Sequence, residues 1–81
     1  MDKFDIIQDH NISTPDGKRV EVIKLVGTDV FPSTDAVIDN AVDIGNNLNA
    51  DMIVGFQFQS TAARTRANRT WSGFGTAIRF V

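Results

Sequence analysis

The sequence predicts a small α+β domain in which a mostly antiparallel sheet of three to four strands packs on one helix. Two segments, 52–59 and 71–80, alternate in the period of two that places successive side chains on opposite faces of a strand. A third segment, 33–48, repeats its apolar residues at helical spacing. The predicted order is ββαββ, or βαββ preceded by an N-terminal extension.

The length and composition indicate one globular domain. The chain has 81 residues, 42% of them hydrophobic and 22% charged, which is ordinary for a folded protein and unlike a disordered one. We expect a single domain over residues 1–81, with an N-terminal strand and turn (1–18) and a βαββ core (19–81). The chain has no run of apolar residues long enough for a membrane span and no visible signal peptide, and it contains no cysteine. We therefore expect a cytoplasmic protein.

The first part of the chain is predicted to form a hairpin. The run Phe4–Gln8 is β-prone, and Thr14-Pro-Asp-Gly17 is typical of a turn because proline presets φ and glycine accepts a positive φ. The run 19–26 alternates only in part, which indicates either a β-bulge or a strand buried on both faces.

The helix is predicted to begin after Ser33, a favourable N-cap, and to end around residues 46–49. Its apolar stripe is formed by Val37, Ala41, Ile44 and Leu48, widened by Ile38 and Val42, and its wet face by Asp35, Asp39 and Asp43. Gly45 costs about 1 kcal/mol relative to alanine inside a helix. We interpret it as a point where the helix approaches the sheet closely.

The two later strands are assigned faces from their alternation. The strand over 52–59 is predicted to place Met52, Val54, Phe56 and Phe58 on one face and Ile53, Gly55, Gln57 and Gln59 on the other. The last strand is predicted to place Trp71, Gly73, Gly75 and Ala77 on one face and Phe74, Thr76, Ile78 and Phe80 on the other. Gly73 and Gly75 are interpreted as points where a helix or another chain approaches the strand.

One helix can cover only one face of such a sheet, whereas the strands carry large apolar residues on more than one face. Because monomers rarely expose extended apolar patches, the pattern predicts a homo-oligomer. The alternative is a monomer whose twisted sheet leaves one face exposed to solvent.

The stretch Ala50-Asp-Met-Ile-Val-Gly55, followed by a strand, a variable loop and Gly75-Thr-Ala-Ile78, resembles the YbjQ-like family of heavy-metal-binding proteins. The resemblance covers roughly residues 20–81. It implies an α+β subunit that assembles into a ring-like or shell-like oligomer and has no established activity.

A second stretch, Val22-Ile-Lys-Leu-Val-Gly-Thr28 followed by 33–42, is similar to the first strand and helix start of dodecins. Dodecins are hollow flavin-storing oligomers of βαββ subunits. The similarity implies a small-ligand carrier, with Trp71 and the pair Phe56 and Phe58 lining a site between subunits. Asp51 and Met52 stand where dodecins carry their flavin-stacking tryptophan.

Charge is distributed unevenly along the chain. Residues 1–60 hold all ten acids against four bases, whereas residues 61–81 hold four arginines and no acid. Arg64, Arg66, Arg69 and Trp71 form a basic loop that ends in an aromatic residue. In one interpretation this loop binds phosphates and stacks on a base, as single-stranded nucleic-acid binders do. In the other, its arginines pair with the aspartates of a neighbouring subunit.

The sequence offers little for metal binding or catalysis. His10 is the one histidine, and the helical aspartates are more typical of a solvated face than of a cation site. No serine or threonine has a plausible histidine base. We therefore expect no enzyme activity, no cofactor and no metal, and a self-assembling structural or binding module whose main partner is itself.

Overall fold

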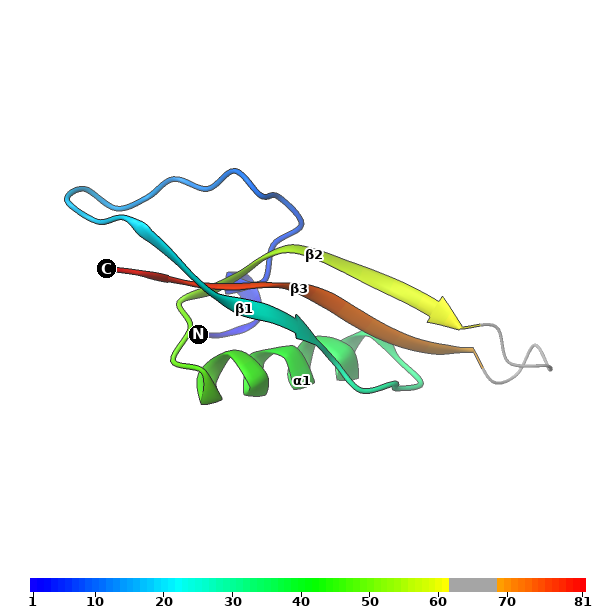
Figure 1. Ribbon diagram of the computed structural model, residues 1–81. Helices are drawn as coiled ribbons and strands as arrows, with labels where there is room; N and C mark the ends of the chain where they lie inside the picture. Colours follow the sequence, from blue (N-terminus) through cyan, green and yellow to red (C-terminus); the bar gives the residue numbers. More distant parts are fainter. Residues whose placement is uncertain (62–68) are drawn as a thin grey trace.

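The computed structural model, which describes residues 1–61 and 69–81, is an α+β domain with one helix on an antiparallel three-stranded sheet (Figure 1). Its elements are a short 3-10 helix η1 (Lys3–Asp5), β1 (Val20–Gly27), α1 (Thr34–Asn47), β2 (Met52–Thr61) and β3 (Thr70–Phe80). The strand order is β1-β3-β2, so β3 is central and pairs with both neighbours. The predicted fold class is confirmed.

Helix α1 forms where its caps and apolar stripe predict it. The Ser33 side chain accepts a hydrogen bond from the Ala36 backbone N–H and so satisfies one of the free donors at the helix start. Val37, Ala41 and Gly45 are buried, whereas the three aspartates of the predicted wet face are exposed. The stripe packs on the sheet, and Val37 and Ala41 share one core cluster with Ala77 of β3.

β1 contains the bulge that its irregular alternation allowed. Val22 pairs with Ile78 and Lys24 pairs with Ala77, so Ile23 is the extra residue. Ile23 packs against the core cluster, which contains residues from the helix side of the sheet. The bulge, rather than burial on both faces, explains why Val22 and Ile23 do not follow one simple alternation.

The predicted faces are right for β3 and wrong for half of β2. The pairing of β2 with β3 shifts between Val54 and Gln57, and Gly55 adopts a left-handed φ of 63°. Phe56 therefore turns to the helix side, where it joins the core cluster with Ile53. A strict period of two missed this bulge because nothing in the alternation of this segment is irregular.

The space beside the β3 glycines is filled by β2 and not by the helix. A Cβ on Gly73 would collide with the Phe56 ring, and one on Gly75 would lie 2.8 Å from Cγ2 of Ile53. The space beside Gly45 of α1 is filled by the N-terminal residue, because a Cβ there would collide with the Met1 thioether. The expected close approach of helix and sheet at Gly45 is therefore wrong.

The predicted N-terminal hairpin is also wrong. Asp2 and Asp5 form a reciprocal capping box that winds Lys3–Asp5 into η1. The chain then runs beside β2, forming one isolated bridge between Ile6 and Ile53. Segment 1–19 is thus the N-terminal extension of a βαββ core, and its turn lies where predicted, with Gly17 at a φ of 76°.

Within residues 1–61 and 69–81, no helix has both the length and the hydropathy that a membrane crossing requires.

Candidate functional site

The sheet face opposite α1, called the open face below, carries exposed apolar side chains. Strand pairing places Val20, Val22 and Leu25 of β1 on this face with Thr76, Ile78 and Phe80 of β3, and alternation adds Phe74. The exposed fractions are 41% for Val20, 64% for Val22, 77% for Leu25 and 42% for Phe74. The half of the open face that includes β1, an edge strand, is therefore apolar and uncovered.

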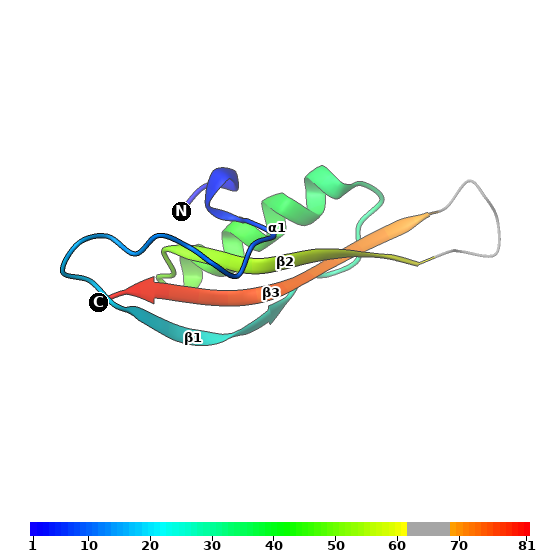
Figure 2. The ribbon, with the colours of Figure 1, turned by 90° about the horizontal axis from the view of Figure 1, so that it is seen from above.

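The other half of the open face is covered by the chain itself. Residues 6–13, called the strap below, run along the edge of β2 and then pass over this strand (Figure 2). The Ile7 N–H donates to the Ile53 carbonyl, and the Ile7 carbonyl accepts from the Phe56 N–H, at 3.0 and 2.9 Å. Beneath the strap, Val54 and Ile78 are 7% and 2% exposed.

The bulge in β2 anchors the strap. The Gly55 N–H donates to the Asp9 carbonyl at 3.1 Å, and the His10 ring lies where a Cβ of residue 55 would be. A groove of about 380 Å³ follows the edge of the strap, with His10, Asn11 and Ile12 on one side and Val20, Val22 and Thr76 among the residues on the other. The polar strap residues His10 and Asn11 thus border the apolar surface on one side.

The predicted basic loop is described only in part. Arg64 and Arg66 lie outside the described residues. Arg69 is exposed, and its guanidinium carbon lies 5.8 Å from the centre of the Trp71 ring, within the range of a cation–π contact. Trp71 is half-buried and meets the ring of Phe58 edge-on at 6.5 Å, and Phe58 in turn lies 5.4 Å from Phe56.

This aromatic row has a structural cause. Trp71 exchanges two backbone hydrogen bonds of 2.7 Å with Phe31, in the loop between β1 and α1. These bonds fix the start of β3 to that loop. Because Phe58 pairs with Gly73, its ring lies on the helix side beside Trp71. The row therefore extends the core outward past the helix, and Arg69 lies at its exposed end.

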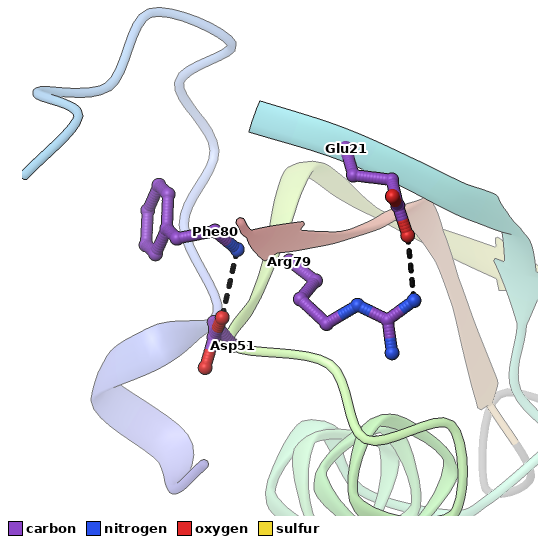
Figure 3. A network of polar contacts seen from close by, with 4 residues as sticks. All are labelled: Glu21, Asp51, Arg79 and Phe80. Carbon is purple, nitrogen blue, oxygen red and sulfur yellow. Dashed lines mark hydrogen bonds and ion pairs between the residues drawn. The ribbon is translucent and has the colours of Figure 1, made fainter. Parts of the chain in front are cut away.

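Polar contacts link neighbouring segments at the C-terminal end of β3. Arg79 pairs with Glu21 across β3 and β1, and the Asp51 carboxylate accepts from the Phe80 N–H at 2.8 Å (Figure 3). Arg79 therefore serves the fold and is not part of a free basic surface. Sequence reasoning missed both contacts, because each joins residues far apart in the chain.

No three metal-ligating side chains converge anywhere in residues 1–61 and 69–81. Asp35, Asp39 and Asp43 are exposed along α1, and His10 packs on Gly55 at the opposite face of the sheet.

Comparisons with known proteins agree with the fold and add no activity. No family model matches the chain, and no curated protein matches it. Among solved structures, the fold is similar to a protein of unknown function from Pediococcus pentosaceus ATCC 25745 that belongs to the DUF74 family. The TM-score is 0.73 at 13% identity, over 94% of this chain and 96% of that one. At that identity the likeness shows the shared fold alone.

Proposed function

We propose that this chain is a non-catalytic, self-assembling structural or binding module of YbjQ-like type, whose copies cover each other's open face. The observation that carries the proposal is the exposed apolar strip of Val20, Val22, Leu25 and Phe74. Contiguous apolar surface of this kind is typical of protein interfaces. The βαββ core shared with the DUF74 protein supports a module of this type and leaves its biological role open.

The energetics favour association through this strip. Fully burying a leucine or valine side chain yields about 1.5–3 kcal/mol relative to exposure. Leu25 and Val22 are 77% and 64% exposed, so most of that free energy is still available for binding. The strap already covers Val54 and Ile78, which leaves the uncovered apolar half beside the free edge of β1 as the contact surface.

Light scattering across a dilution series tests the proposal. We expect the wild-type protein to have the mass of several chains at micromolar concentration, and the Val22→Thr/Leu25→Gln variant to dissociate at concentrations where the wild type stays assembled. Val30→Thr is the matched control, because Val30 is 58% exposed but lies in the loop after β1. A wild-type protein that keeps the mass of one chain throughout would contradict the proposal.

A second candidate function is favoured by the contact between Arg69 and Trp71. A cation beside a half-buried indole is suited to a planar anionic ligand, either a flavin-like molecule held between subunits or the bases of single-stranded nucleic acid. Trp71 is the one tryptophan in the chain, so its fluorescence reports on this site.

Titration with flavin mononucleotide and with a short oligothymidylate separates the two ligand classes. Quenching that is lost in Arg69→Gln but kept in Lys18→Gln would support the site, and steep weakening by salt would indicate nucleic acid. The absence of quenching by either ligand at low salt would contradict this candidate.

A further inference from the structure

One flank of α1, beside η1, forms a second apolar groove. Its apolar lining is Ile38 and Val42 of α1 and Phe4 of η1, and Phe4 is 77% exposed. Two adjoining hollows of about 470 and 370 Å³ share Phe4 and Asp39 in their lining. We call them together the η1–α1 groove.

The rim of the η1–α1 groove is strongly acidic. Four carboxylates border it, those of Asp2, Asp35, Asp39 and Asp43, against two cations, Lys3 and the N-terminal ammonium of Met1. The Lys3 ammonium lies 5.2 Å from the Phe4 ring centre. Within the described part of the chain, none of these carboxylates is in an ion pair. The groove therefore suits a partner that presents an aromatic or apolar group together with a cation.

This chain carries such a surface beyond the N-terminal end of α1. The ends of β2 and β3, residues 57–60 and 69–73, extend past the N-terminal end of α1 as a hairpin arm (Figures 1 and 2). The arm presents Phe58, Trp71 and the exposed Arg69. Its β3 part, residues 69–73, belongs to the segment 61–81, which has four arginines and no acid.

We infer that the hairpin arm of one copy docks in the η1–α1 groove of a second copy, with Arg69 among the groove carboxylates and the Phe58–Trp71 pair against Phe4. The arm and the groove lie on different parts of one molecule: both views place η1 beside the body of α1 and the arm beyond the helix end (Figures 1 and 2). Contact between unlike surfaces is head-to-tail and forms a ring or a chain of copies. The inference rests on the proposed self-assembly and assigns it a second, charge-dependent contact.

Charge reversal on each side of the contact tests the inference. Alone, the full-length Asp39→Lys and Arg69→Glu variants each place like charges together, so we expect at least about a tenfold weaker association by light scattering. Mixed in equal amounts, they restore both contacts, since Arg69 of the first variant meets Asp39 of the second and Glu meets Lys. We expect the mixture to assemble like the wild type. Asp16→Lys, in the exposed turn after the strap, is the charge-matched control.

The outcomes separate this inference from the proposed function. Wild-type chains that stay monomeric overturn both. Wild-type assembly that neither single variant weakens overturns the arm–groove contact and leaves the open-face contact standing. Single variants that are weakened but not rescued by mixing also overturn it, because only a contact between copies is repaired in a mixture.

Discussion

Replacing Gly55 with alanine tests how much the bulge in β2, and the strap that it anchors, contribute to stability. Gly55 has a φ of 63°, in the left-handed region that costs other residues about 1–2 kcal/mol. The new Cβ would collide with the His10 ring and so displace the strap. The strap's hydrogen bond from the Gly55 N–H to Asp9 would then be lost, at about 1 kcal/mol.

Together these terms predict a loss of about 2–3 kcal/mol in the free energy of unfolding for Gly55→Ala. For a domain of this size each 1 kcal/mol lowers the melting temperature by about 4–8 °C, so we expect a decrease of at least about 8 °C. Calorimetry at fixed protein concentration measures it, since association would otherwise shift the transition.

Two further variants isolate the cause. Gly27→Ala is the matched control, because no atom lies within 4 Å of the position that its Cβ would take and its φ is not positive, so we expect a change within about 0.5 kcal/mol. Gly55→Ala combined with His10→Ala removes the collision but keeps the backbone strain, so its loss should be smaller than the sum of the single losses. If Gly55→Ala melts like Gly27→Ala, the account of the bulge is wrong.

Three other substitutions have expected outcomes that chemical denaturation checks. Gly73→Ala pushes a Cβ into the buried ring of Phe56 and should cost about 1–3 kcal/mol; no loss would mean that the ring can move aside. Ser33→Ala removes the N-cap of α1 and should cost about 1 kcal/mol, whereas Ser33→Asp should retain most of the stability. Asp51→Ala deprives the Phe80 N–H of its acceptor and should cost about 1 kcal/mol, and Asp51→Asn should cost less because it keeps an acceptor oxygen.

The parts of the fold that the sequence predicts correctly are those set by local interactions. The start of α1 depends on Ser33 and residues within one turn of it, and the faces of β3 depend on an uninterrupted alternation. The partial alternation of β1 indicated a bulge as one of two possibilities, and the structure contains it at Ile23.

The errors come from contacts between distant segments. The alternation of 52–59 is regular, and the phase change at Gly55 is tied to the strap, which lies far earlier in the chain. The N-terminal run has the composition of a strand, but the capping box of Asp2 and Asp5 winds its first residues into η1. Gly45 accommodates Met1, a contact that no local pattern encodes.

The sequence predicted which residues could form the candidate site, but not where in the fold they lie. An excess of apolar surface over what one helix covers follows from the alternation, but its position beside β1 depends on how far the strap reaches across the sheet. Arg69 and Trp71 were candidates from the sequence, whereas their contact with Phe58 depends on the register of β2 on β3.

The rate of cysteine labelling at position 22 tests most directly whether a second copy covers the open face. The chain has no cysteine, so Val22→Cys introduces a single reporter on that face, and Val30→Cys introduces one in the loop after β1. If copies cover the open face, labelling of Val22→Cys slows as protein concentration rises through the micromolar range, while labelling of Val30→Cys does not change. A Val22→Cys rate that is the same at every concentration would mean that no second copy covers this face.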